Sequence, residues 1–210
     1  MAITSLARFT VPGAGGADDS QGVQGLLMPK LRYKYRVIFN NFGVTSQSHE
    51  LTKQVMTASR PGVSFENIVL DVYNSKINYA GKYTWADVTI VLRDDVSNSV
   101  SKLVGQQIQK QFDFFEQSSA SSGADYKFTT FIEILDGGNG ENAFTVLERF
   151  ELYGCYLQNT VYQGGDYKSS EPLDVTLTIK YDNAIQTDEA GNRNGIGALV
   201  GRTVRSLATG

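Results

Sequence analysis

The chain has little of the side-chain chemistry on which most active sites depend. Its 210 residues include one cysteine, Cys155, and one histidine, His49. One cysteine excludes an internal disulfide framework, and together the two residues cannot supply the four ligands of a closed zinc site. Cys155 lies among leucines and tyrosines, which favours a buried, inert thiol over a nucleophile. We therefore expect no metal and no cofactor.

Catalytic motifs are missing as well. His49 lies in the polar stretch TSQSHELT, where neither Ser46 nor Ser48 stands in a nucleophile-elbow context, so a solvated surface histidine is expected. GIGALVG (195–201) has the start of a dinucleotide fingerprint but no room for the βαβ unit that must follow. The pair Asp94-Asp95 is better explained by the start of a helix than by an acid–base couple. The sequence predicts no catalytic residue, and hence a protein that is not an enzyme.

Long apolar runs and an excess of positive charge are also lacking. No run approaches the roughly 20 apolar residues of a membrane helix, and the first residues have no continuous apolar core of a secretory signal. The net charge of −3 argues against a protein that grips nucleic acid along its whole surface. We expect neither a membrane partner nor specific binding of DNA.

Composition divides the chain into three parts. Residues 1–28 contain the Gly-rich stretch VPGAGGADDSQGVQG and are expected to form a flexible N-terminal arm. Residues 182–210 show no periodicity and are expected to form a C-terminal extension. The folded domain is predicted to span residues 29–181.

Alternation of apolar and polar residues dominates this domain. In LRYKYRVIF, one face carries Leu31, Tyr33 and Tyr35 while Arg32 and Lys34 lie on the other, which is the period of a half-buried strand. The predicted strands cover residues 31–39, 50–58, 64–73, 83–92, 126–135, 144–157 and 175–181.

One segment has a helical period instead. Apolar residues from Val96 to Phe115 recur at steps of three and four, which predicts an amphipathic helix over about 96–116, started by Asp95, Ser97 or Asn98. Gly105 in its middle suggests close packing. The fold class is therefore mainly β: a β-sandwich or open barrel of about seven strands with one flanking amphipathic α-helix.

The run NSKINYAGKYTWADVTI (74–90) predicts two β segments that meet at Ala80-Gly81. Several strands place Thr, Asn and Tyr on their outer faces, and neutral polar and aromatic faces of this type suit contacts with copies of the same protein. A half-open sheet also has edges that a soluble monomer normally blunts. The pattern favours an assembly protein that forms a ring or stack.

The same run carries a family resemblance. Residues 74–84, NSKINYAGKYT, resemble the N-x-K-I-N-x-A-G-x-x-T run of the tail tube proteins of contractile-tailed (T4-like) bacteriophages. LRYKYRVIF, TASRPGVSFENI, the helix at about 96–116 and DVTLTIKYD follow in the order of that family, so the resemblance covers about residues 29–181.

The resemblance implies a β-sandwich subunit that assembles into hexameric rings, which stack into a hollow tube. It implies as partners the tail sheath protein, the tape-measure protein, and the baseplate and tail-terminator proteins, with the genome passing through the lumen. The location implied is the tail of a virion made in the cytoplasm of a bacterial host. The matched positions become inter-subunit contact candidates: Asn74, Lys76, Ile77, Asn78, Ala80 and Gly81.

A conduit for DNA should repel phosphate, so we expect an acidic lumen. The candidates for its lining are Glu133, Asp136, Glu148, Glu151 and Asp174. Glu148 and Glu151 lie three residues apart on a strand, hence on opposite faces.

Two alternatives stay open on the sequence. The first is a related tube, either that of a phage-derived contractile injection particle or the tube initiator of a baseplate. The second belongs to another class: a monomeric β-sandwich module that binds carbohydrate or a small ligand through its Tyr-rich faces.

Overall fold

The computed structural model describes residues 29–44, 48–136, 145–188, 191–193 and 195–198, with the side chains of 48–50 left aside. The chain divides into two units, Met1–Tyr33 and Lys34–Gly210. The fold below is that of the second unit. The predicted N-terminal arm (1–28) lies outside the described residues.

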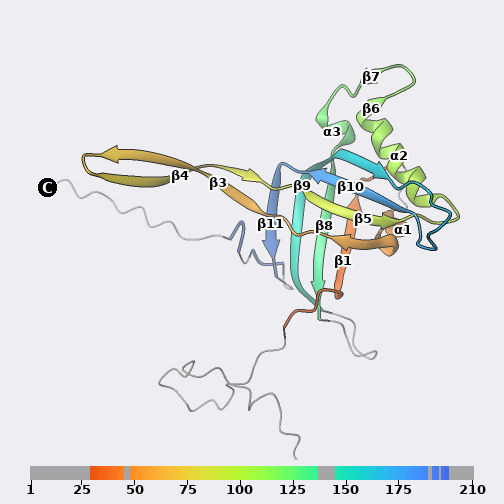
Figure 1. Cartoon of the computed structure of the whole chain (residues 1–210), viewed down its shortest axis with the longest axis horizontal. Helices are drawn as coiled ribbons and strands as arrows, with labels where there is room; N and C mark the ends of the chain where they lie inside the picture. Colours follow the sequence, from red (N-terminus) through yellow and green to blue (C-terminus); the bar gives the residue numbers. More distant parts are fainter. Residues whose placement is uncertain (1–28, 45–47, 137–144, 189–190, 194, 199–210) are drawn as a thin grey trace, which may run out of the picture. The chain divides into compact units, whose positions relative to one another are not determined.

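One antiparallel sheet of seven strands forms the body (Figure 1). Its order is β1–β8–β9–β10–β5–β2, and β11 also pairs with β9. The bounds of these strands are β1 Tyr35–Asn40, β2 Val55–Ala58, β5 Val88–Arg93, β8 Phe128–Leu135, β9 Val146–Tyr162, β10 Asp174–Lys180 and β11 Asn183–Thr187.

The long strand β9 is central to this sheet, because β8, β10 and β11 all pair with it. Along one of its edges, β10 and β11 follow each other: Lys180 lies opposite Tyr156, and Asn183 lies opposite Tyr153. Between these pairs, Gly154 has a φ of 68°, and a Cβ there would lie 2.2 Å from an oxygen of Asp182. Only glycine fits this crossing without strain. The sheet thus continues past Tyr181, where the sequence placed the end of the domain.

The sheet curls until its two outer strands approach each other. The Tyr35 hydroxyl on β1 donates a 2.6 Å hydrogen bond to the Met56 carbonyl on β2. Alternating residues fill the interior, among them Val37, Phe39, Leu152 and Leu177. The predicted open barrel of about seven strands is confirmed.

The helix α2 (Ser99–Gln111) covers part of the core. It buries Val100, Leu103 and Val104, and it is shorter than predicted. Val96 and Phe115, expected on its buried stripe, are almost fully exposed outside it. A Cβ at Gly105 would meet no atom of the described chain within 4 Å, so this glycine marks no close packing. Asp95 accepts the Ser99 N–H at 2.9 Å, as its predicted place at the helix start requires.

Two further predictions were wrong in detail. The segment 50–58 is a strand only in its second half, because α1 (Ser48–Gln54) precedes β2 and contains His49. Strand β1 begins at Tyr35 rather than Leu31, and Tyr33 is exposed. The remaining elements are short: β6 Phe112–Asp113, β7 Ser118–Ser119 and α3 Gly123–Tyr126.

Candidate functional site

The strands β3 (Val63–Val72) and β4 (Ser75–Trp85) form a hairpin of their own (Figure 1). Among the residues that the structure describes, these two strands pair only with each other. Every residue of β3 is exposed. An isolated two-stranded hairpin is marginally stable in water at best.

The turn of the hairpin is at Tyr73-Asn74, where Tyr73 has a φ of 50° and Val72 pairs with Ser75. The predicted meeting of two β segments at Ala80-Gly81 was wrong. β4 runs through these residues, and Gly81 instead marks a bulge: Gly81 and Lys82 together oppose Glu66. A Cβ at Gly81 would meet the Glu66 backbone and side chain at 3.2 Å, so the bulge favours glycine.

The bulge moves the apolar side chains from one face of the hairpin to the other. Between the bulge and the turn, directly opposed residues share a face. One face there carries five exposed apolar side chains, here called the tip patch: Ile68, Leu70, Val72, Ile77 and Tyr79. The opposite face is mainly polar, with Asn67, Val69, Asp71, Lys76, Asn78 and Ala80.

Beyond the bulge, the apolar residues continue on the opposite face, with Phe65 opposite Tyr83 and Val63 opposite Trp85. There the Trp85 ring packs at a tilt against Tyr181 of the body, with ring centroids 5.5 Å apart. The base of the hairpin therefore contacts the body through Trp85, while Phe65 and Tyr83 stay exposed. The tip patch is left without a partner in the described chain, with exposed fractions between 42% and 51%.

The predicted contact residues all fall in this hairpin, but on different surfaces. Ile77 belongs to the tip patch, while Lys76, Asn78 and Ala80 lie on the polar face. Asn74 is in the turn and Gly81 is at the bulge. The other aliphatic residues of the patch were not predicted, although their alternation in NIVLDV gives the signal once the turn is placed correctly: Ile68, Leu70 and Val72.

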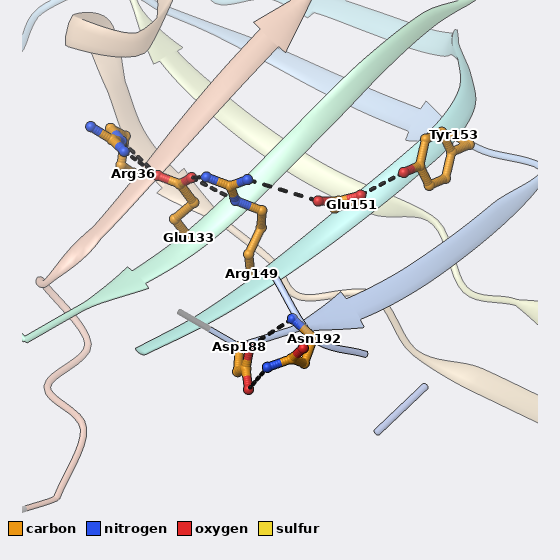
Figure 2. A network of polar contacts seen from close by, with 7 residues as sticks. All are labelled: Arg36, Glu133, Arg149, Glu151, Tyr153, Asp188 and Asn192. Atoms are coloured by element: carbon orange, nitrogen blue, oxygen red, sulfur yellow. Dashed lines mark hydrogen bonds and ion pairs between the residues drawn. The ribbon is translucent and has the colours of Figure 1, made fainter. Parts of the chain in front are cut away.

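A second polar arrangement crosses β1, β8 and β9 (Figure 2). The fully buried Glu133 lies between two arginines: it accepts hydrogen bonds from Arg36 Nε at 2.7 Å and from Arg149 Nε at 2.8 Å. Arg149 also lies 3.8 Å from Glu151, which accepts a 2.5 Å bond from the Tyr153 hydroxyl. This bond raises the pKa of Tyr153 above its ordinary value.

The structure does not bring the five predicted lumen acids together. Glu133 and Glu151 both belong to the network of Figure 2, in which Arg36 and Arg149 pair with Glu133 and Arg149 also lies near Glu151. Glu148 is nearly buried on the opposite face of β9, as predicted, and accepts a bond from Gln186. Asp136 directly follows β8 and accepts bonds from Thr145, while Asp174 lies opposite Arg93 at the start of β10. The acidic lumen stays a prediction.

The described residues offer little to catalytic chemistry. Within them, no three His, Cys, Asp or Glu side chains gather so as to hold a metal ion. Burial raises the pKa of the Cys155 thiol to about 11, which keeps it protonated. None of the helices in this part of the chain is both long and apolar enough to cross a membrane.

Comparison with known proteins gives a match at the level of structure. No family model and no curated protein matches the chain. The fold is similar to a chain in the sheath/tube terminator of PVC, an extracellular contractile injection system, with a TM-score of 0.57 and 12% identity over 78% of this chain and 99% of that one. It is equally similar to a chain of the tube-terminating cap of the anti-feeding prophage (TM-score 0.57, 12% identity, 78% and 94% covered). A chain of the PVC sheath–tube complex gives a TM-score of 0.54 at 12% identity, with 78% and 94% covered.

These matches define the class of the fold: the chain has the architecture of proteins from contractile injection particles. The resemblance to a tail tube protein is thereby confirmed for the fold. Each match covers nearly the whole of the other chain, so the common part is a complete subunit fold rather than a shared motif.

Proposed function

We propose that the chain is a structural subunit that assembles with copies of itself into the tube of a contractile particle. The tip patch carries this proposal, because five apolar side chains on one face of an unsupported hairpin need a protein surface to cover them. The fold shared with chains of contractile injection particles supports a tube over a ligand-binding module.

The proposed assembly is a stack of hexameric rings, with the hairpin residues Asn74, Lys76, Ile77, Asn78, Ala80 and Gly81 at or near the contacts between subunits. Its proposed partners are a surrounding sheath, a tape-measure protein inside, and baseplate and terminator proteins at the ends. The similar chains come from a sheath–tube complex, a terminator and a cap, which supports the sheath and the terminator among these partners.

Within this class, we propose the inner tail tube of a contractile phage tail, which conducts the genome into the host. The alternative is the tube of an extracellular injection particle, which the source of the similar structures favours. Mass spectrometry of purified particles decides between them. The phage proposal expects the chain in particles that carry a DNA-filled head, and detection only in headless particles would replace it by the alternative.

For the lumen we propose acidic lining residues among Glu133, Asp136, Glu148, Glu151 and Asp174. Asp136 is exposed, so it carries the proposal best. Glu151 lies 3.8 Å from Arg149, which offsets its charge. Glu133 and Glu148 are buried against cationic or amide groups, which reduces the field that they project into a lumen. A cryo-EM structure of the tube with an arginine- or lysine-lined bore would refute it.

Negative-stain electron microscopy of the purified full chain, over a range of concentrations, tests the assembly itself. Rings or tubes with a central hole are the expected result. A chain that stays monomeric at every concentration, and that also fails to join a growing tube in particle lysates, would instead favour the ligand-binding module.

A further inference from the structure

The segment that follows α2 presents a second apolar surface, here called the aromatic loop (Phe112–Glu116). Phe114 is 63% exposed and Phe115 is 92% exposed. The Phe112 and Phe114 rings pack edge to face with their centroids 5.2 Å apart. Two phenylalanines held in water on one short loop are unfavourable for a monomer, so this surface also calls for a partner.

The aromatic loop is held in one conformation by its own acid. Asp113 Oδ1 accepts hydrogen bonds from the Phe115 N–H at 2.9 Å, from the Glu116 N–H at 3.2 Å and from Gln109 Nε2 at 2.7 Å. The two backbone bonds lower the pKa of Asp113. These bonds hold the backbone that carries the exposed rings, so less conformational entropy is lost when a partner binds.

Because a subunit of a ring or a tube contacts its neighbours through two different surfaces, the tip patch needs a complement elsewhere on the chain. The aromatic loop has the chemistry of that complement. Aromatic rings pack well on aliphatic and tyrosine side chains, and aromatics are enriched at the centres of interfaces. One opposite-charge pair is available at the edge of this contact: Glu116 is exposed beside the rings, and Lys82 is exposed at the hairpin bulge, opposite the exposed Glu66.

We propose that the aromatic loop of one copy docks on the tip patch of a second copy, so that Phe114 and Phe115 cover Ile68, Leu70, Val72, Ile77 and Tyr79. This inference rests on the proposed function and adds to it the surface that receives the hairpin. The contact is heterologous: each copy offers its loop to one neighbour and its hairpin to another.

Cysteine cross-linking between two variants of the full chain tests this pairing directly. Phe115→Cys in one chain is mixed with Ile77→Cys in another, under conditions of assembly, with a short bifunctional thiol reagent. The matched control replaces Ile77→Cys by Val69→Cys, an exposed aliphatic residue on the polar face of the hairpin. We expect dimers with Ile77→Cys at several times the yield seen with Val69→Cys. Equal yields, or none in chains that do assemble, would overturn the proposal.

Assembly of the double variant Phe114→Ser/Phe115→Ser gives an independent readout. We expect the concentration needed for assembly to rise about tenfold or more, since buried aromatic anchors dominate interface energies. Tyr167→Ser is the control, because Tyr167 is a fully exposed aromatic outside the loop. If the wild type and both variants assemble alike, the docking inference fails and the proposed function stands. If the wild type itself never assembles, both fail.

Discussion

The environment of Glu133 is the one that could least be predicted from the sequence. It was predicted as a lumen acid, yet it is fully buried between Arg36 and Arg149 on the neighbouring strands. The register places the three side chains directly opposite one another on one face of the sheet. A buried carboxylate is stable there because both of its oxygens accept charge-assisted hydrogen bonds.

This arrangement predicts an asymmetry between two variants. Glu133→Gln keeps the shape and leaves two half-exposed arginines that water can solvate, so we expect a loss of about 1–3 kcal/mol. Arg36→Met/Arg149→Met leaves the buried carboxylate without a cationic partner and should lower the free energy of unfolding by about 3–5 kcal/mol. Urea unfolding of the full chain measures both. A larger loss for Glu133→Gln than for the arginine pair would contradict this explanation.

Cys155 gives a prediction with a pH dependence. Burial raises the pKa of its thiol from 9.0 to about 11, so the neutral thiol stabilises the fold below pH 9 and this contribution is lost as the pH rises through about 11. At pH 8 we expect thiol labelling to be about 100-fold slower in the folded chain than in urea, since only the thiolate reacts. Rapid labelling of the native chain at pH 8 would refute the buried, inert assignment.

At the scale of elements, α2 is attached to the sheet through a glutamine. Gln111 Nε2 donates to the Leu157 carbonyl at 3.0 Å, and the Leu157 N–H donates to Gln111 Oε1 at 2.8 Å. The side-chain amide therefore pairs with both backbone groups of Leu157, beside the register shift between β9 and β10. Both backbone polar groups of Leu157 are thereby satisfied.

Gln111→Ala should therefore destabilise the chain by about 1–3 kcal/mol, because two part-buried backbone groups lose their partners. Gln106→Ala is the control on the same helix, because the hydrogen bond that Gln106 accepts from the Val44 N–H is long, at 3.4 Å, and weak. We expect its loss to stay within about 0.5 kcal/mol. Thermal and urea unfolding measure the difference, and equal losses would show that the Leu157 pairing contributes nothing specific.

The strands with regular alternation could be predicted from the sequence, and so could the class of the fold. Val175, Leu177 and Ile179 are buried, as their period of two requires. The structure of segment 50–58 was harder to predict. SHELTKQ (48–54) contains helix formers, and β-branched residues suited to a strand come with VMTA (55–58). The packing of α1 against β1 decides the boundary, and local propensity does not contain that contact.

The hairpin shows why its functional surface could not be derived from spacing alone. Placing the turn at Ala80-Gly81 rather than Tyr73-Asn74 pairs the wrong residues and assigns the apolar side chains to the wrong faces. The bulge adds a further shift that exchanges the two faces along the hairpin. The sequence could locate the contact region, but the tip patch emerges only once the register is known.

For the whole molecule, the tip patch, and not the hairpin as such, is the surface that joins copies of the chain in the proposed assembly. Val72 and Val69 allow a matched test, since both are valines of β3 with exposed fractions of 47% and 45% on opposite faces. A charge on the patch would be buried in the assembly without a partner, whereas one on the polar face would stay near water.

The decisive measurement is sedimentation velocity, with negative-stain microscopy, on the full-length wild type, Val72→Asp and Val69→Asp under identical conditions. We predict rings or tubes for the wild type and Val69→Asp, and monomers for Val72→Asp. All three should be equally stable to urea, since Val69 and Val72 lie outside the core. Assembly of Val72→Asp at the level of the wild type, or equal loss of assembly in both variants, would contradict the claim.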